Sequence, residues 1–232
     1  MDIAGKTALV TGANRGLGRH LGAELRDRGA HVYAAARDPE TVDLADVTPI
    51  ALDITDPESV ASAAQAASGV TILVNNAGSQ TGSSLLTGDL AAIRLDMDTI
   101  FFGTLAVTRA FTPQLAAQGS GAVLNILSAL SWLTIPRSGA YCAAKSAEWS
   151  LTNALRLELA PQGIRVTALH VGYMDTDMTR NLEVPKSDPA DIAQLAIDGI
   201  EAGDAEITAD ETSRRVLAGL SAGVAGLYPQ VA

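Results

Sequence analysis

The sequence predicts an α/β domain in which helices cover both faces of a doubly wound parallel sheet of about seven strands. Short apolar runs that favour β-structure alternate with longer segments that have helical spacing. Hydrophobic residues make up 47% of the 232 residues and aromatic residues only 4%, so Ala, Val, Leu and Ile must fill the core, as where helices pack on a parallel sheet. No linker-like tract divides the chain, which predicts a single domain over residues 1–232.

Apolar runs with strand character and segments with helical spacing follow one another along the chain. The strands are expected at residues 7–11, 31–36, 47–52, 70–74, 122–127 and 164–171, and the helices at residues 17–28, 57–67, 89–118, 139–160 and 189–202. A short strand near residues 206–208 and a helix from about residue 210 complete the chain. Such repeats predict right-handed crossovers, and ligands then bind at the carboxyl ends of the strands. The residues directly after each strand are therefore the candidates for function.

The first strand runs into Thr11–Gly18, which reads TGANRGLG, and then into a helix. Gly12 permits a tight turn, while Gly16 and Gly18 remove side chains where a diphosphate and the neighbouring strand must approach closely. The amides at the helix start then face the phosphates. A glycine trio alone is a weak signal, but its position between strand and helix predicts a dinucleotide site. The expected contacts are Gly12, Asn14, Arg15, Gly16, Leu17 and Gly18.

Two arginines predict that the cofactor is NADP(H) in preference to NAD(H). Arg37 follows the second strand, where a dinucleotide fold contacts the adenosine ribose, and an arginine there can neutralise a 2′-phosphate. Arg15 in the glycine turn is placed to close on the same phosphate from the other side. The alternative is that both arginines are simply solvated, as arginine commonly is.

The third and fourth strands also end in candidate cofactor contacts. Asp53 can accept a hydrogen bond from the adenine amino group, and in the NNAG motif Ala77 and Gly78 keep the wall beside the ribose low. Asp53 could equally cap the helix that begins near residue 57, although Asp56 is better placed for that role. The expected cofactor contacts here are Asp53, Ile54, Asn75, Ala77 and Gly78.

Residues 140–149 read AYCAAKSAEW, a stretch without Gly or Pro that is expected to be helical. Tyr141 lies four residues before Lys145, which places both side chains on one helix face, one turn apart. By itself the pair is a weak signal, because a packing contact or a solvated surface pair has the same spacing. Cys142 points about 100° away on the helix and is interpreted as a small packed residue.

With the TGxxxGxG turn, the NNAG motif and Ser128 thirteen residues before a Tyr-x-x-x-Lys, the sequence resembles the short-chain dehydrogenase/reductase family over essentially its whole length. It resembles the short, single-domain branch, because the longer epimerase and dehydratase branch typically carries TGxxGxxG and an added substrate domain. The resemblance implies a Rossmann-type fold that binds NAD(P). It also implies that Tyr141 is the catalytic acid/base, that Lys145 is its partner and that Ser128 orients the substrate.

The resemblance implies a catalytic role for the Tyr141 and Lys145 pair. A free tyrosine has a pKa of about 10, and a neighbouring ammonium together with the cofactor charge should lower the pKa of Tyr141. Lys145 should also hold the nicotinamide ribose hydroxyls. Ser128 and Tyr141 should bind the carbonyl oxygen while hydride arrives, and Tyr141 should deliver the proton. Ser131 and Ser138 are competing hydroxyls, but only Ser128 lies directly at the end of a strand.

The predicted activity is NADPH-dependent, reversible reduction of a ketone or aldehyde to an alcohol, that of a carbonyl reductase. Among enzymes, the alternatives are physiological alcohol oxidation and imine reduction. From a different class, a non-catalytic NADP(H) redox sensor would keep the glycine turn and lose the chemistry. The intact Ser128, Tyr141 and Lys145 argue against a sensor, while Ile100 mildly supports one.

Two stretches depart from the family pattern. Ile100, in TIFFGT, stands where the family usually carries an asparagine near a relay water, which puts that proton relay in doubt. We expect Ile100 to shape the pocket or to pack the helix. Val171 and Gly172 stand where Pro-Gly is common, while Thr176 matches the residue that holds the nicotinamide amide. The resemblance implies cofactor contacts at Val171, Gly172, Met174 and Thr176.

The substrate pocket is expected between the loop after Ser128, the segment after Gly172 and a mobile loop over residues 176–189. These segments carry large apolar side chains and little fixed charge, which suggests a bulky apolar or aromatic carbonyl substrate. The alternative for each side chain is ordinary core packing. The expected lining residues are Ile100, Leu130, Trp132, Leu133, Tyr173, Met174 and Met178.

The formal net charge of −10 disfavours nucleic acid and anionic membrane partners, because both require a basic patch. A single cysteine, the lack of a leader pattern in MDIAGKTALV and the lack of an apolar run long enough to span a bilayer predict a reducing, cytoplasmic setting. The histidines are scattered, so no metal site is expected. The segments 89–118 and 139–160 are the usual dimer elements of the family, which implies a homodimer or homotetramer.

Overall fold

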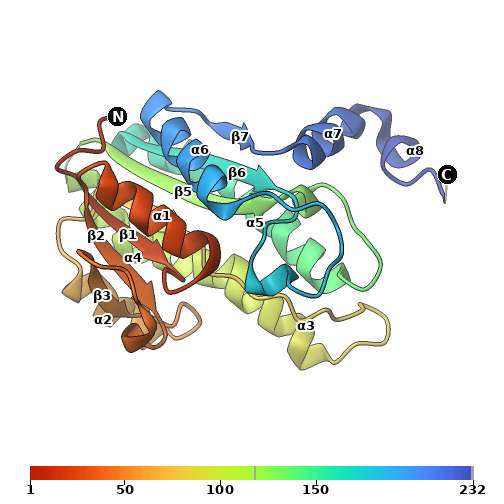
Figure 1. Ribbon diagram of the computed structural model, residues 1–232, viewed down its shortest axis with the longest axis horizontal. Helices are drawn as coiled ribbons and strands as arrows, with labels where there is room; N and C mark the ends of the chain where they lie inside the picture. Colours follow the sequence, from red (N-terminus) through yellow and green to blue (C-terminus); the bar gives the residue numbers. More distant parts are fainter. Residues whose placement is uncertain (118, 231–232) are drawn as a thin grey trace.

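The computed structural model describes residues 1–117 and 119–230, and within them seven parallel strands form one sheet (Figure 1). The strand order is β3-β2-β1-β4-β5-β6-β7, in which the winding reverses between β1 and β4. This order confirms the predicted doubly wound fold. The strands are β1 (Thr7–Thr11), β2 (His31–Ala36), β3 (Thr48–Ala51), β4 (Ile72–Asn75), β5 (Gly121–Ser128), β6 (Ile164–Val171) and β7 (Glu206–Thr208).

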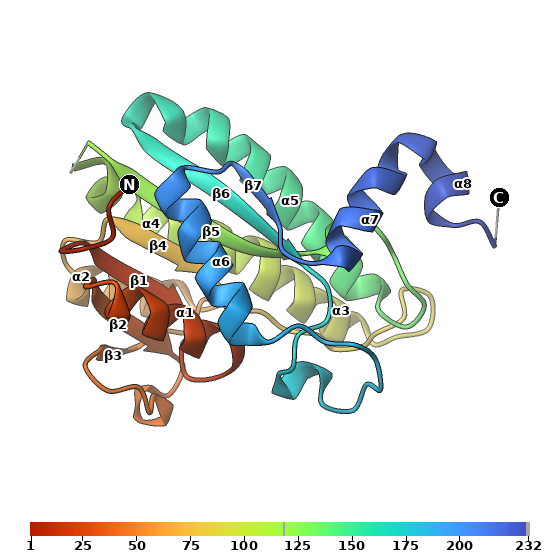
Figure 2. The same ribbon diagram turned by 45° about the horizontal axis from the view of Figure 1, so that its top comes forward.

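Helices cover both faces of the sheet, as Figure 2 shows. One apolar core lies under α1 and α6, and the other lies under α2, α4 and α5. Alternate residues of a strand enter different cores: in β1, Ala8 and Val10 face the first core and Leu9 faces the second. The helices are α1 (Gly16–Asp27), α2 (Pro57–Ala66), α3 (Leu90–Met97), α4 (Thr104–Ala117), α5 (Gly139–Leu159), α6 (Pro189–Ala202), α7 (Glu211–Gly219) and α8 (Gly223–Leu227).

The segment predicted as a helix over residues 89–118 is helical from Leu90 to Ala117, but its middle is a π-helical turn; residue 118 lies outside the described residues. The structure divides this segment into α3, a π-helical turn η2 (Asp98–Gly103) and α4. A π-helical turn accommodates an extra residue and changes the direction of the side chains around it. At its end, Gly103 lies so close to Ile54 that an added Cβ atom would come within 2.8 Å of the Ile54 Cδ1 atom. The next residue, Thr104, donates its hydroxyl to Glu148 on α5 at 3.1 Å.

Gly18 in the first turn of α1 lies against the backbone of the glycine turn. An added Cβ atom would come within 2.2 Å of the Gly12 carbonyl oxygen and 2.4 Å of Asn76 Nδ2. We expect Gly18→Ala to lower the free energy of unfolding by about 1–3 kcal/mol, measured by chemical denaturation, because backbone must move to admit the methyl group. Gly22→Ala is the matched control, because its Cβ would meet side chains and no backbone atom: Leu44 at 3.3 Å and Val32 at 3.9 Å. An equal loss in both variants would contradict this packing argument.

The C-terminal segment packs over the loop that follows β5. Helices α7 and α8 lie beyond the carboxyl end of the sheet (Figure 1), and Val216 of α7 packs with Ala129 and Trp132. Thr134 donates its amide to the Tyr228 hydroxyl at 2.8 Å. The end of the chain therefore covers one side of the region where the sequence places the substrate.

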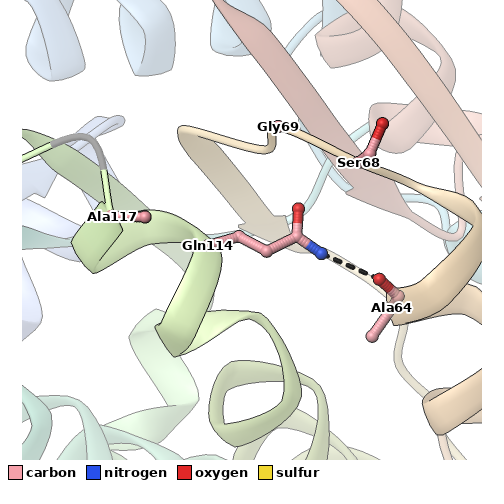
Figure 3. Close-up of a pocket in the computed structure, with 5 residues that line it drawn as sticks. All are labelled: Ala64, Ser68, Gly69, Gln114 and Ala117. Atoms are coloured by element: carbon pink, nitrogen blue, oxygen red, sulfur yellow. Dashed lines mark hydrogen bonds between the residues drawn. The ribbon is translucent and has the colours of Figure 1, made fainter.

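A shallow hollow of about 290 Å³ lies near the amino ends of β4 and β5 (Figure 3). Gln114 of α4 donates to the carbonyl oxygens of Ala64 at 2.8 Å and Ala67 at 2.9 Å, and it accepts from the Val70 amide at 3.1 Å. These bonds join α4 to the end of α2 and to the segment before β4. The hollow therefore lies away from the carboxyl ends of the strands, where ligands of this fold bind. Its lining residues are Ala64, Ser68, Gly69, Gln114 and Ala117.

Within the described part of the chain, no helix is both long and apolar enough to cross a membrane.

Candidate active site

The carboxyl ends of four adjacent strands bring the predicted site residues together. Strands β1, β4, β5 and β6 are neighbours in the sheet, and they lead into the glycine turn, the NNAG motif, Ser128 and Val171 respectively. Helix α5 packs against β5 and β6 and carries Tyr141 and Lys145. The topology therefore places the predicted cofactor contacts beside the predicted catalytic side chains.

The glycine turn requires glycine at two positions and is fastened to β4 by Asn76. Gly12 and Gly16 have φ angles of +64° and +52°, in the left-handed region that other residues rarely adopt. Asn76 Nδ2 donates to the carbonyl oxygens of Thr11 at 2.9 Å and Gly12 at 3.2 Å. Sequence reasoning missed Asn76, although this residue stands inside the NNAG motif.

The first turn of α1 is left open to an anion. In α2, α3, α6 and α7, an aspartate at the N-cap accepts a hydrogen bond from a backbone amide of the first turn. At the N-cap of α1, Arg15 makes no such bond, and the first turn of α1 contains no acidic residue. The amides of this turn can therefore bind a phosphate, which fits the diphosphate of a dinucleotide cofactor. The Leu17 side chain is buried in the core, so only its backbone is available to a ligand there.

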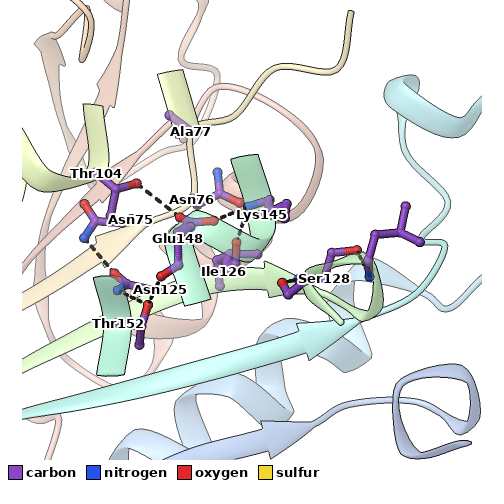
Figure 4. A network of polar contacts seen from close by, with 12 residues as sticks. Asn75, Asn76, Ala77, Thr104, Asn125, Ile126, Ser128, Lys145, Glu148 and Thr152 are labelled. Carbon is purple, nitrogen blue, oxygen red and sulfur yellow. Dashed lines mark hydrogen bonds and ion pairs between the residues drawn. The ribbon is translucent and has the colours of Figure 1, made fainter. Parts of the chain in front are cut away.

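Asn75 directs its side chain into the protein interior. Its Nδ2 donates to Thr108 Oγ1 at 3.0 Å and to Asn125 Oδ1 at 2.8 Å, and Asn125 donates in turn to Thr152 at 2.9 Å (Figure 4). This buried network joins β4 and β5 to α4 and α5. The cofactor contact predicted for Asn75 is therefore not available to its side chain.

Both arginines at the adenosine end are exposed. Arg37 follows β2, and the Arg15 side chain is 68% exposed, with its Nη1 atom 3.9 Å from Asp177 Oδ2. Asn14, next to Arg15, donates to the Thr41 hydroxyl at 3.0 Å. Neither guanidinium is buried in a structural network, so both can meet a 2′-phosphate. Exposure also agrees with the alternative that both are simply solvated.

Asp53 lies at the end of β3 as an acceptor in a turn. Its Oδ1 atom accepts from the Thr55 hydroxyl at 2.7 Å and from the Thr55 amide at 2.9 Å. These bonds, helped by the charge of Arg37, hold the pKa of Asp53 below its usual value despite partial burial. Asp56, and not Asp53, caps α2 by accepting from the Glu58 amide at 3.0 Å.

The neighbours of these residues differ in exposure. The Ile54 side chain is 8% exposed and lies against Gly103, and Ala77 packs on the second core. Beside Gly78, an added Cβ atom would meet nothing nearer than the Asn76 carbonyl oxygen at 3.9 Å. No side chain therefore crowds Gly78, where the ribose is expected, whereas Ile54 can offer only its backbone or the edge of its side chain.

Ser128, Tyr141 and Lys145 lie together at the end of β5. The Ser128 hydroxyl lies close enough to the Tyr141 phenol to lower its pKa, and Ser128 Oγ accepts a hydrogen bond from the Leu130 amide at 3.1 Å. Lys145 Nζ lies 6.0 Å from the centre of the Tyr141 ring. The competing hydroxyl of Ser131 is buried and accepts from the Ser128 amide at 3.3 Å, so it braces the end of the strand.

The pKa of Tyr141 is raised in the protein without cofactor. The lowered value expected from the Lys145 ammonium together with the cofactor charge concerns the occupied site and stays a prediction. Burial is the largest cause of the raised pKa, and it outweighs the ammonium of Lys145 and the hydroxyl of Ser128, which lower the pKa. Glu148 raises the pKa of Tyr141 further. For Lys145 itself, burial lowers the pKa, but the charges of Glu148 and Tyr141 outweigh burial and leave the pKa raised.

Two predicted lining residues are buried. Ile100 is fully buried within η2, so it packs the helix and does not line an open pocket. The Trp132 ring is 7% exposed and stacks on His170, with ring centroids 3.7 Å apart. His170 lies behind the site with its Nδ1 atom 3.2 Å from the Ser128 carbonyl oxygen, and burial lowers its pKa to about 4. His170 is therefore neutral near pH 7 and supports the end of β5.

The remaining lining residues are accessible. Leu130, Leu133 and Tyr173 are partly exposed, and Met178 is 52% exposed. They come from the loop after β5 and the segment after β6, as the sequence indicates. The region is rich in apolar surface that a ligand can cover.

The predicted substrate loop is anchored where it leaves and rejoins the body of the protein. Ser187 donates its amide to the Tyr173 carbonyl oxygen at 2.8 Å, and Asp175 donates its amide to the Ser187 carbonyl oxygen at 3.0 Å. Thr176 lies beside the glycine turn, because an added Cβ atom at Gly16 would be 3.4 Å from Thr176 Cγ2. The loop therefore starts next to the place where the cofactor phosphates are expected.

The residues just after β6 contribute mainly backbone. The Val171 side chain is 2% exposed and belongs to the core under α1 and α6. Gly172 donates its amide to Asp210 Oδ2 at 2.6 Å, and an added Cβ atom would come within 2.8 Å of the same oxygen. Met174 is partly buried against the core. Asp210 therefore fixes the backbone on which the nicotinamide contacts are expected.

Among residues 1–117 and 119–230, no three His, Cys, Asp or Glu side chains form a group that could hold a metal ion.

Comparison with known proteins identifies the family. The model of the short chain dehydrogenases matches residues 6–186, from β1 to the loop after β6. The chain belongs to the short-chain dehydrogenase family. Short-chain dehydrogenases are oxidoreductases that use a nicotinamide cofactor, and the glycine turn, the open first turn of α1 and Lys145 are the parts of this chain that fit one. The resemblance seen in the sequence is thereby confirmed.

Solved and characterised relatives place the chain among other short-chain dehydrogenases. A short chain dehydrogenase from Burkholderia cenocepacia in complex with NADP is 36% identical, with a TM-score of 0.94 over 100% of this chain and 99% of that chain. D-erythrulose reductase of Gallus gallus is 32% identical over 85% of this chain and 83% of that protein. A 3-ketoacyl-(acyl-carrier-protein) reductase from Brucella melitensis, complexed with NADH, is 27% identical, with a TM-score of 0.80 over 85% and 91%.

Proposed function

We propose that this short-chain dehydrogenase is an NADPH-dependent carbonyl reductase that reversibly converts a ketone or aldehyde to an alcohol. The observation that carries the proposal is the grouping of Ser128, Tyr141 and Lys145 at the end of β5, beside the glycine turn. The similarity to D-erythrulose reductase supports a carbonyl substrate. The intact trio also weighs against a non-catalytic redox sensor.

The proposed roles follow from the positions of the three side chains. When bound, the cofactor supplies the hydride for reduction. Ser128 and Tyr141 hold the carbonyl oxygen and stabilise the negative charge that develops on it. Tyr141 then donates its proton, and its raised pKa keeps the phenol protonated, which suits the reductive direction. Lys145 uses two of its three N–H donors on Ile126 and Glu148, which leaves one for a ribose hydroxyl.

The substrate class that we propose is a bulky apolar or aromatic carbonyl. Accessible Leu130, Tyr173 and Met178 support it, although Trp132 is buried and Ile100 does not reach the pocket. The test follows NADPH consumption with a panel of ketones, aldehydes and imines, and NADP⁺ reduction with the matching alcohols. Turnover of apolar carbonyls is expected. Preferred turnover of small charged keto acids would contradict the substrate class, and no turnover of any compound would favour the sensor.

A preference for NADPH over NADH is proposed from Arg15 and Arg37. We expect Arg37→Ala to raise the KM for NADPH by about 10- to 100-fold, because charge-assisted hydrogen bonds to the 2′-phosphate are lost. The KM for NADH should change little, because NADH lacks this phosphate. Steady-state kinetics with both cofactors measure the effect. If the KM values for NADPH and NADH rise together, or if neither changes, Arg37 does not bind the 2′-phosphate.

We also propose a homodimer or homotetramer. Leu157 on α5 is 79% exposed and Phe102 on η2 is 53% exposed, so the elements that the family resemblance assigns to dimerisation carry uncovered apolar surface.

A further inference from the structure

A buried carboxylate contacts the candidate catalytic lysine. Lys145 Nζ donates to Glu148 Oε2 at 2.7 Å and to the Ile126 carbonyl oxygen at 2.6 Å (Figure 4). Glu148 is 2% exposed and Lys145 is 6% exposed. A carboxylate is seldom buried to this extent unless a partner compensates its charge. Neither the family motifs nor the predicted site includes Glu148.

The Glu148 carboxylate is fixed from two sides. One oxygen accepts from Lys145, and the other accepts from the hydroxyl of Thr104 at 3.1 Å. Thr104 is the first residue of α4 after the π-helical turn, so that turn lies directly beside this contact. Ile100 in the same turn is buried and has no polar side-chain atom with which to hold Lys145. The carboxylate is therefore a built-in acceptor for the ammonium.

Other charged groups around Lys145 have different roles. Tyr141 on the same helix favours the charged lysine only when the phenol is ionised. His170 on β6 is neutral near pH 7, because burial lowers its pKa to about 4. Asp96 on α3, which packs against α5, accepts hydrogen bonds from the side chains of Ser79 and Thr81. Near pH 7, Glu148 is thus the described carboxylate that compensates the charge of Lys145.

We propose that Glu148 is a positioning residue that holds Lys145 as an ammonium and aims its Nζ atom at the cofactor side of the site. Without Glu148, the burial of Lys145 would favour the neutral amine, which can neither stabilise a tyrosinate by its charge nor donate three hydrogen bonds. The consequence for catalysis rests on the proposed function. The effect on the protonation of Lys145 does not, and it can be measured without cofactor.

The test uses the scarcity of lysine in this chain. Lys6, Lys145 and Lys186 are its three lysines, so the side-chain NMR signals of protein labelled with carbon-13 lysine can be assigned by single Lys→Arg replacements. In the wild type, Lys145 should lose its proton above the ordinary lysine pKa. In Glu148→Gln, which keeps the shape and one acceptor oxygen for Lys145 but removes the charge, Lys145 should lose its proton at a lower pH than in the wild type. Glu148→Asp should restore much of the difference, and Glu158→Gln, at an exposed site on the same helix, should have no effect.

The corresponding kinetic test measures the rate of carbonyl reduction as a function of pH. In Glu148→Gln, the reduction rate should fall at a lower pH than in the wild type, with a loss of about tenfold or more near pH 9 relative to wild type. An unchanged titration of Lys145 in Glu148→Gln would overturn the proposal, even if the enzyme is active. If that variant does not fold, a wild-type Lys145 that titrates below the ordinary lysine value overturns it. If Lys145 titrates as expected but no carbonyl is reduced, the proposed function fails and this inference stands.

Discussion

Replacing Lys145 by methionine should lower the free energy of unfolding by about 3–5 kcal/mol near pH 7, because it leaves the carboxylate of Glu148 buried without its partner. In the wild type, Lys145 Nζ lies 2.7 Å from that carboxylate, and both side chains are almost inaccessible to water. Thr104 is then the remaining hydrogen-bond donor to Glu148. A neutral hydroxyl cannot compensate a full charge in a medium of low polarity.

The loss in Lys145→Met should depend on pH in a defined direction. Burial raises the pKa of Glu148, and without Lys145 nothing opposes this effect through an opposite charge. A carboxyl group whose pKa is higher in the folded than in the unfolded state destabilises the fold as pH rises from the unfolded pKa of about 4.3 to the folded pKa. The variant should therefore approach wild-type stability near pH 4 and diverge from it toward pH 7. Urea denaturation at a series of pH values measures this difference.

A second variant and a control separate this charge effect from lost packing. Lys145→Met combined with Glu148→Gln should recover most of the stability at pH 7, because no charge remains buried. Lys186→Met removes the same type of side chain from Asp175, 3.8 Å away. Lys186 is 16% exposed but Asp175 is 77% exposed, so water screens the remaining carboxylate and the loss should be less than about 1 kcal/mol. If the double variant is no more stable than Lys145→Met, the destabilisation comes from packing and not from Glu148.

The sheet was predictable because the composition of each strand segment indicates β-structure by itself. Runs such as TALVT and IRVTALHV are buried over most of their length on both faces, so they are mainly apolar and rich in β-branched residues. The catalytic trio was predictable for a related reason. Ser128 follows such a run directly, and the spacing of Tyr141 and Lys145 is fixed by the helix itself. Local patterns therefore determine most of the candidate site.

The π-helical turn was not predictable from local pattern. Residues 98–103 read DTIFFG, which has no proline and continues the helical spacing on both sides. The turn coincides with tertiary contacts, among them the close approach of Gly103 to Ile54 and the bond from Thr104 to Glu148. Such contacts join segments that are far apart in the sequence, so a window of neighbouring residues does not contain them.

The raised pKa of Tyr141 in the protein without cofactor was not predictable for the same reason. From the sequence, the Lys145 ammonium together with the cofactor charge suggests a lowered pKa for the phenol. The structure adds burial and the carboxylate of Glu148, and the two together raise that pKa. A glutamate three residues after Lys145 has the spacing of an ordinary surface ion pair. Only the packing of α5 against its neighbours shows that the pair is buried.

Tyr141→Phe should reduce kcat for carbonyl reduction by about 10²- to 10⁴-fold, because it removes the proton donor and leaves the ring in place. The KM for NADPH should change little, and so should stability, since one hydroxyl is lost. Tyr33→Phe, on β2 and away from Ser128, is the matched control and should retain activity. Stopped-flow measurement of NADPH oxidation under single-turnover conditions separates the chemical step from product release.

The pH dependence of the wild type provides an independent check on the same group. Because the pKa of Tyr141 is raised in the protein without cofactor, its phenol stays protonated through the neutral range and can donate to a carbonyl oxygen there. Alcohol oxidation needs the ionised form, so its rate should increase with pH into the alkaline range while the reduction rate declines there. These opposite slopes should disappear in Tyr141→Phe. If the variant keeps wild-type activity, or if both directions respond to pH with the same sign, another group transfers the proton.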